Sequence, residues 1–137
     1  VSEHTKVFLF SETLAQADAF SLQNMDLFRN YVRQCGIYGK GTDLGAALQK
    51  LCDLPDKVLN QSTTLLILSD TKTIDHNAAI AAVEQAKRLC GKVLWLNPIP
   101  QYMWKYSRSI RIYENLCPMV CCNTLQSLAQ ACKKLIL

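Results

Sequence analysis

The sequence lacks any uninterrupted apolar run approaching the roughly 18 residues of a membrane-spanning helix, and any block of about five like charges. Its first residues, Val-Ser-Glu-His-Thr-Lys, have no apolar centre typical of a secretory signal. Charged residues are few, at 19%, and the formal net charge of +4 is spread along the chain. We therefore expect no membrane span and no nucleic-acid partner, because nucleic-acid-binding domains usually carry a concentrated basic patch.

Apolar residues and cysteine, by contrast, are plentiful. Half of the 137 residues are hydrophobic, which argues against disorder, and we expect residues 1–137 to form a single domain around one core. The seven cysteines are an odd number, and the sequence carries no secretory signal. They are therefore expected to be mostly reduced, buried thiols of a cytoplasmic protein.

Short apolar runs alternate with segments of helical periodicity along the chain. The run Leu65–Leu68 is too short for a buried helix and ends in Ser69-Asp70, as the central strand of a parallel sheet does. A second such run, Val93–Leu96, ends in Asn97-Pro98. This alternation predicts a Rossmann-like α/β fold, a mainly parallel open sheet flanked by helices, with Leu65–Leu68 central and Val93–Leu96 beside it.

The remaining elements are predicted from the same patterns. Lys6–Phe10 and Pro118–Cys122 are predicted as strands, and residues 14–20 as an edge strand or an irregular return. Helices are predicted to begin at Ser21, at Thr42 or Asp43, at Asp75 or Asn77, after Pro100 and at Thr124.

Two side chains that offer oxygen ligands are predicted to meet where the parallel strands end. Thr42 follows a glycine-rich loop, and Asp70 directly follows the predicted central strand. Ligands of open α/β sheets bind at this edge, and hydroxyl and carboxylate oxygens suit Mg²⁺, Ca²⁺ or Mn²⁺ rather than zinc or copper. Two ligands are too few for a tight site, and Ser69 and Asp70 can equally start a turn or cap a helix.

Three segments carry a resemblance to a known family. They are Gly-Thr-Asp-Leu-Gly-Ala-Ala-Leu from Gly41, Leu-Ile-Leu-Ser-Asp up to Asp70, and Trp-Leu-Asn-Pro from Trp95. With the order of elements between about Val7 and Leu135, they resemble a von Willebrand factor A (VWA) domain. The Trp-Leu-Asn-Pro segment is similar to that of the CoxE-like VWA proteins, which are accessory to carbon monoxide dehydrogenase and related systems.

The resemblance implies a divalent-cation adhesion site. In the family, an Asp-x-Ser-x-Ser motif after the first strand, a threonine and an aspartate bind the ion. Thr42 matches the threonine and Asp70 the aspartate, while Asp43 and Ser69 are candidates to support these ligands without touching the ion. The Asp-x-Ser-x-Ser motif is absent, and Thr71 stands where the family commonly has glycine. We therefore expect Mg²⁺ binding to be weak or absent in this chain.

The resemblance also implies a fold that is incomplete at its N-terminus. Lys6–Phe10 corresponds to the second strand of the family, so the first strand and first helix have no counterpart. In the family the first strand lies between the second and the fourth. Without it, Val7–Phe10 and Leu65–Leu68 are expected either to pair directly or to expose hydrogen-bonding edges.

By resemblance, the expected function is protein binding without catalysis, as an accessory or maturation factor acting with a MoxR-type AAA+ ATPase or a metalloenzyme. Two alternatives stay open: an α/β enzyme that binds a nucleotide or phosphate ligand at the same edge, and a scaffold that binds without metal. The enzyme has less support, because Gly39–Gly45 is not a P-loop. His4 and His76 are expected to be exposed, and neither has a cysteine nearby with which to form a nucleophile–base pair.

Two further clusters have both structural and functional interpretations. Cys117, Cys121 and Cys122, with Cys132, could bind a metal, but they lack the paired spacing of structural zinc sites, and buried thiols are favoured. The aromatic residues around Trp104 and Tyr106 could form a surface for a partner or pack in the core.

Overall fold

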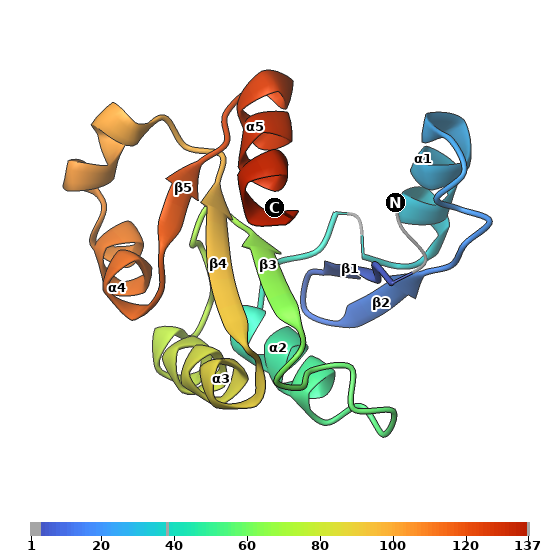
Figure 1. Ribbon diagram of the computed structural model, residues 1–137, viewed down its shortest axis with the longest axis horizontal. Helices are drawn as coiled ribbons and strands as arrows, with labels where there is room; N and C mark the ends of the chain where they lie inside the picture. Colours follow the sequence, from blue (N-terminus) through green and yellow to red (C-terminus); the bar gives the residue numbers. More distant parts are fainter. Residues whose placement is uncertain (1–3, 38, 137) are drawn as a thin grey trace.

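The computed structural model of the protein describes residues 4–37 and 39–136. Its strands form two separate sheets (Figure 1). β1 (Val7–Phe10) and β2 (Leu14–Ala17) pair as an antiparallel hairpin. β3 (Thr64–Leu68), β4 (Lys92–Asn97) and β5 (Met119–Cys121) form a parallel sheet in that order.

Helices connect and flank these strands. They are α1 (Met25–Gln34), α2 (Leu44–Cys52), α3 (His76–Leu89), the 3₁₀ helix η1 (Gln101–Tyr106), α4 (Arg108–Leu116) and α5 (Leu125–Ile136). The prediction of a mixed α/β fold with a parallel sheet flanked by helices is confirmed. In the described part of the chain, no helix combines the length and the apolar character needed to cross a membrane.

The two faces of the parallel sheet are covered unequally. On one face, Ile67, Val93 and Trp95 join the main core with residues of α2, α3 and α4. On the other face, Leu94 and Leu96 form a smaller cluster with residues of α5. The main core therefore lies beneath the sheet, and the opposite face depends on a single helix in the described residues.

β3 is an edge strand and β4 is the central one, so the prediction that Leu65–Leu68 is central is wrong. Leu66 and Leu68 are 39% and 53% exposed, although each is a large aliphatic residue. In the described residues β1 pairs only with β2, and β3 pairs only with β4. Of the two expected alternatives, direct pairing of β1 with β3 or exposed hydrogen-bonding edges, the structure has the second. An apolar run indicates a strand suited to neighbours on both sides, but it does not show that both are present.

Helix starts follow local capping chemistry. Asp43 and Asp75 cap α2 and α3 through side-chain oxygens, as two of the predicted alternatives had it. α1 begins later than predicted, because Asn24 rather than Ser21 accepts the backbone N–H of the first turn. Ser21 instead closes a turn with Asp18, whose carboxylate accepts its N–H. The rule for cap residues was right, but several such residues competed for one position.

The helix predicted after Pro100 is divided in two. Ser107 ends η1 and caps α4 by accepting the N–H of Ile110, so an extended residue separates the two helices. Trp104 is buried and its indole N–H donates to the carbonyl of Ile99, which fixes η1 against the end of β4.

Candidate functional site

Three loops are tied together at the carboxyl ends of β1 and β3. The backbone N–H of Asp43 donates to the carbonyl of Ser11, directly after β1, at 2.7 Å. The N–H of Ile74, in the loop after β3, donates to the carbonyl of Thr42 at 3.1 Å. The start of α2 therefore bridges the other two loops, and the structure places Thr42 in contact with the loop that carries Asp70.

Thr73 strengthens this connection. Its hydroxyl accepts the backbone N–H of Leu44 at 3.0 Å and lies 3.4 Å from the carbonyl of Thr42. The same hydroxyl thus satisfies one donor at the start of α2 and one acceptor just before it. Sequence reasoning missed Thr73, and a signal existed, since threonine is a frequent hydrogen-bonding residue in turns that precede helices.

Asp70 and Ser69 both take part in a turn. The Asp70 carboxylate accepts the N–H of Lys72 at 3.0 Å, and the Ser69 hydroxyl accepts the N–H of Thr71 at 3.1 Å. The turn interpretation of Ser69-Asp70 therefore holds in the structure. Because the hydrogen bond to Lys72 uses one oxygen of a half-buried carboxylate, it leaves lone pairs that a cation could share.

Asp43 is a helix cap. Its carboxylate accepts the N–H of Ala46 at 3.0 Å, and it is partly buried against the loop after β1. Asp43 therefore has a structural role of its own. Of the two residues predicted to begin this helix, Thr42 and Asp43, it is Asp43 that caps it.

Thr71 holds the loop after β3 in an uncommon conformation. Its φ is +74°, in the left-handed region that β-branched residues rarely adopt, and its side chain is fully buried. The hydroxyl lies 2.7 Å from that of Ser109, near the start of α4, so a side-chain contact supports the backbone. Such a conformation costs about 1–3 kcal/mol and persists where its surroundings impose it. The residue after Asp70 therefore fixes the loop, although threonine replaces the family's glycine.

An aromatic column lies behind this loop. The indole N–H of Trp95 donates to the carbonyl of Ser69 at 2.8 Å, and the Trp95 ring stacks on Tyr113 with 4.8 Å between centroids. The Tyr113 hydroxyl is 2.9 Å from Nδ1 of His76, so the expectation that His76 is an exposed residue is wrong. Burial, and then the nearby Asp75 carboxylate, raises the pKa of Tyr113 to about 12. The Tyr113 hydroxyl is thus neutral at physiological pH, and its hydrogen bond positions the ring of His76.

Asn97 shapes the loop after β4. The side chain is fully buried; its oxygen accepts the N–H of Ile99, and its amide nitrogen lies 3.4 Å from the sulfur of Met119. Its hydrogen bonds stabilise the turn through Pro98, and both ends of the amide are engaged within the protein.

The cysteines in the described residues whose side chains are placed are free thiols, namely Cys35, Cys52, Cys90, Cys117, Cys121 and Cys122. Burial raises the pKa of Cys52 to about 11, with smaller contributions from Asp53 and Cys90, and burial also raises the pKa of Cys90 and Cys117. Because the thiolate is the reactive form, these three thiols are poor nucleophiles and poor metal ligands at neutral pH. The Cys132 side chain lies outside the described part.

The donor set for a metal ion at the loop edge is sparse. Among the side chains that the structure describes, which do not include that of Cys132, no three His, Cys, Asp or Glu side chains are placed to hold an ion together. Ser11 adds one unexpected feature. Its hydroxyl is buried and has no hydrogen-bond partner among the described residues, while its carbonyl accepts the backbone N–H of Asp43. Hydroxyls from Thr42 and Ser11 and one carboxylate from Asp70 would leave an ion largely coordinated by water.

A parallel sheet flanked by helices, with a loop cluster at the carboxyl ends of its strands, defines an α/β binding fold. The chain belongs to the family of VWA-domain-containing, CoxE-like proteins, whose family model matches residues 1–131. This match confirms the resemblance drawn from the sequence. Comparisons with curated proteins and with solved structures gave no match.

Proposed function

We propose that this chain is a non-catalytic, protein-binding accessory module whose partner docks at the loop edge formed after β1, before α2 and after β3. Family membership supports an interaction or accessory role. The observation that carries the proposal is the hydrogen bond from Ile74 to Thr42, which holds the loops of the two candidate ligands together. The partner proposed from the resemblance is a MoxR-type AAA+ ATPase, acting in the cytoplasm on a metalloenzyme.

Exposed apolar side chains, one of them in the loop edge itself and two in η1 after β4, support a protein partner. Ile74 is 72% exposed, and Tyr102 and Tyr106 of η1 are 74% and 78% exposed. Tyr106 also carries the Lys105 ammonium 5.1 Å from its ring centroid. Exposed aromatic residues are enriched in protein interfaces, whereas Trp104, the other candidate from the sequence, is buried in η1.

Binding to the proposed ATPase can be tested with two matched substitutions. Ile74→Asp places a charge in the docking edge, and we expect the affinity for a purified MoxR-type AAA+ ATPase to fall at least about tenfold, since one lost apolar contact of this size is worth about 1.4 kcal/mol. Phe20→Asp is the control, because Phe20 is also highly exposed but lies between β2 and α1. Equal affinities of the two variants, measured by fluorescence anisotropy, would place the partner elsewhere.

We also propose that Thr42 and Asp70 hold Mg²⁺, or Ca²⁺ or Mn²⁺, only weakly in this chain, with Asp43 and Ser69 supporting the loops. The sparse donor set is the reason. Mg²⁺ gives up its water reluctantly, and two or three protein oxygens replace few of its six ligands.

The expected result is that millimolar Mg²⁺ leaves the melting temperature unchanged, both in the wild type and in Asp70→Ala. A ligand present at its Kd stabilises the native state by only about 0.4 kcal/mol. Asp26→Ala, which removes an exposed carboxylate from α1, controls for general effects of charge. A melting shift of several degrees that Asp70→Ala abolishes and Asp26→Ala preserves would show instead that the site is complete.

A further inference from the structure

We propose that the surface of η1 and the first turns of α4 binds an acidic polypeptide segment that carries an apolar residue among its carboxylates. This surface, the η1–α4 patch, consists of six exposed side chains, Tyr102, Met103, Lys105, Tyr106, Arg108 and Arg111. The inference rests on the proposed function only for the choice of a protein as partner. It adds the chemistry of the bound segment and a contact surface that includes neither Thr42 nor Asp70.

Positive charge is concentrated in the part of the sequence that contains this patch. Six lysine and arginine residues lie between Glu84 and Glu114, and no aspartate or glutamate lies among them. Residues 85–137 have a formal net charge of +7, from eight basic residues and one acidic residue, whereas residues 1–84 have −3, from seven basic and ten acidic residues. The modest total of +4 therefore combines two unlike parts, although no run of like charges marks the basic one.

The cations of the patch have no carboxylate partner in the described part of the chain. The ion pairs that the described residues form all lie outside η1 and α4. Lys105 instead places its ammonium 5.1 Å from the centroid of the Tyr106 ring. Glu114, the acidic residue of α4, is exposed and follows Arg111 by three residues, yet it joins none of these ion pairs. The positive charges of the patch are therefore available to a partner.

The positions of the two arginines do not favour the stability of α4. Arg108 is the first residue of the helix, Arg111 lies one turn later, and the first turn contains no acidic residue. The start of a helix carries partial positive charge that disfavours cations, and like charges one turn apart repel each other. Because these placements oppose helix formation, a role in binding accounts for them better than a role in folding.

Buried residues hold the patch in place from behind. Trp104 anchors η1 through its buried ring, and Ile110 and Tyr113 bury the opposite side of α4. The hydroxyl of Ser109 also lies 2.7 Å from that of Thr71, in the loop after β3. The exposed side chains therefore extend from a fixed scaffold, so little backbone order has to be gained when a partner binds.

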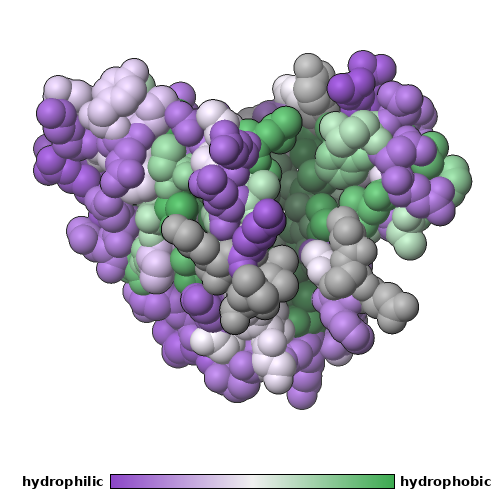
Figure 2. All heavy atoms as spheres, turned by 45° about the horizontal axis from the view of Figure 1, so that its top comes forward, coloured by the Kyte–Doolittle hydropathy of each residue, from purple (hydrophilic) through white to green (hydrophobic). Residues whose placement is uncertain are grey.

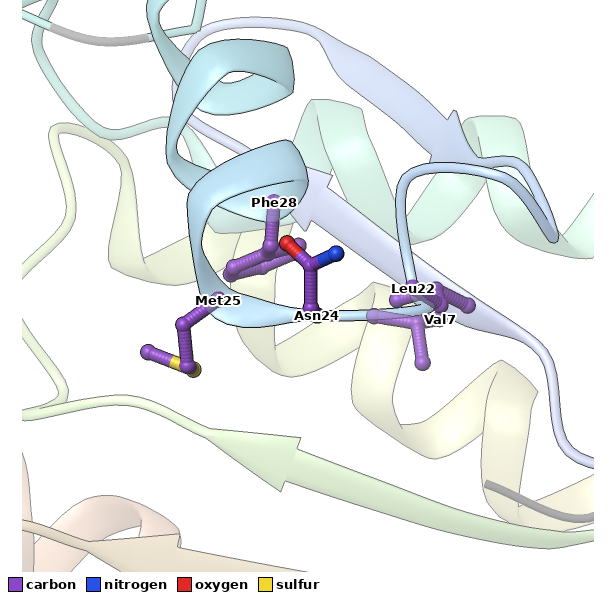
Figure 3. A pocket seen from close by; sticks show the side chains of 5 residues that line it. All are labelled: Val7, Leu22, Asn24, Met25 and Phe28. Atoms are coloured by element: carbon purple, nitrogen blue, oxygen red, sulfur yellow. The ribbon is translucent and has the colours of Figure 1, made fainter.

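The patch differs in its chemistry from the apolar pocket beside α1. Figure 1 shows η1 and α4 on the outer side of the parallel sheet, away from the β1–β2 hairpin and α1. Figure 2 shows mostly hydrophilic surface on that side and hydrophobic surface inside the hollow between the two halves of the molecule. The pocket, of about 290 Å³, has no charged residue in its lining, which consists of Val7, Leu22, Asn24, Met25 and Phe28 (Figure 3). It offers no partner for a carboxylate, so α1 is a suitable place for control substitutions.

The composition of the patch favours a protein segment as its ligand. Tyrosine, methionine and arginine are enriched in protein interfaces, and every residue of the patch except Lys105 is one of these three types. Carboxylates complement the three cations, and an apolar residue between them complements Met103 and the two tyrosine rings. Single-stranded nucleic acid also combines negative charge with stacking rings, but it binds in basic grooves that follow its backbone, whereas this patch is short and lies on an outer surface.

Fluorescence anisotropy of labelled peptides tests the proposal on the 137-residue chain. The probe is the capped peptide Glu-Asp-Phe-Glu-Leu-Asp-Glu, and the control, Gln-Asn-Phe-Gln-Leu-Asn-Gln, keeps its size and its apolar residues without the charges. We expect the acidic peptide to bind at least about tenfold more tightly, because ion pairs form only with the first peptide. Its affinity should fall at least about threefold between about 0.05 M and about 0.3 M NaCl. Equal affinities of the two peptides, or no binding of the acidic one at millimolar concentration, would overturn the proposal.

Two double substitutions with the same change in charge separate the patch from general electrostatic attraction. Arg108→Gln with Arg111→Gln removes two cations of the patch, and Arg29→Gln with Arg33→Gln removes two exposed arginines one turn apart in α1. We expect the first pair to lower the affinity for the acidic peptide at least about tenfold and the second pair to lower it less than about twofold. Equal losses would show that the peptide responds only to net charge, and the patch would not be its site.

Thermal unfolding separates a role in binding from a role in folding. Because cations at the start of α4 oppose the helix dipole, the melting temperature of the Arg108→Gln, Arg111→Gln variant should stay the same or rise. A fall of several degrees would give the two arginines a structural role and contradict the proposal.

An oligothymidylate with as many negative charges as the acidic peptide is the last comparison. Tighter binding of the oligothymidylate than of the peptide would identify nucleic acid as the ligand and overturn the proposal of a protein segment. None of these measurements involves the ATPase or Mg²⁺. A chain that binds the acidic peptide but no ATPase would retain the patch and refute the proposed partner, and the converse result would retain the partner and refute the patch.

Discussion

Replacing Trp95 with alanine is expected to lower the free energy of unfolding by about 3–5 kcal/mol, the range typical of a large aromatic residue removed from a core. Trp95 is fully buried in the central strand, stacks on Tyr113 and donates its indole N–H to Ser69. The substitution thus removes core volume and removes the hydrogen bond from the indole N–H to the carbonyl of Ser69, at the start of the loop that carries Asp70. Urea unfolding followed by circular dichroism measures the change.

Two comparisons isolate the causes of this loss. Tyr106→Ala removes an aromatic ring that is 78% exposed, and its effect should stay within about 0.5 kcal/mol. Trp95→Phe keeps most of the packing but removes the N–H, so it should cost at least the roughly 0.5–1.5 kcal/mol of one hydrogen bond, plus the smaller ring. A Trp95→Ala variant as stable as Tyr106→Ala would contradict the central position of β4.

Replacing Gly45 with alanine is expected to destabilise the protein by about 1–3 kcal/mol, the usual cost of overpacking, although alanine is the better helix former. Gly45 lies in α2 against α3, and a Cβ there would come within 2.8 Å of backbone atoms of Ala78 and Ala79. Because these are backbone atoms, one helix must move away from the other. Thermal and urea unfolding both report this change.

The adjacent residue supplies the matched control. Ala46 is half-buried in the same turn of α2, and Ala46→Gly should cost about 1 kcal/mol through helix propensity alone. If propensity also governed position 45, Gly45→Ala would stabilise the protein by a similar amount. The two explanations therefore predict opposite signs for one substitution, and a gain in stability would show that α2 and α3 are not in close contact at Gly45.

The sequence was informative for several structures that depend on neighbouring residues, although it placed the cap of α1 at Ser21 rather than at Asn24. Asp75 caps α3 as one of the predicted alternatives, and Thr124 accepts the N–H of Ser127 at the start of α5. The buried run around Val93–Leu96 became the central strand β4. Capping and strand formation involve groups a few residues apart, so local patterns predict them well.

The candidate site was predicted less completely. Thr42 and Asp70 do lie in connected loops. The sequence indicated this, because Thr42 follows the glycine-rich loop and Asp70 follows a predicted strand. The sequence did not reveal the contributions of Thr73 and Ser109, or the buried hydroxyl of Ser11, which has no partner within the described part of the chain. These contacts join residues far apart in the chain. Whether a cation binds, and whether residues 1–137 form one domain, stay predictions.

By itself, then, the sequence determined the types of element, their order, and the family to which the chain belongs. Only the tertiary structure decided that β4 is central, that β3 pairs with β4 alone in the described residues, and that His76 reaches Tyr113. The physical reason is that an apolar strand has the same sequence whether one or both of its sides are hydrogen-bonded. The side chains of a strand indicate which of its faces are buried. Its pairing with neighbouring strands is made by backbone N–H and C=O groups, which nearly every residue has, so the sequence does not show how many neighbours it has.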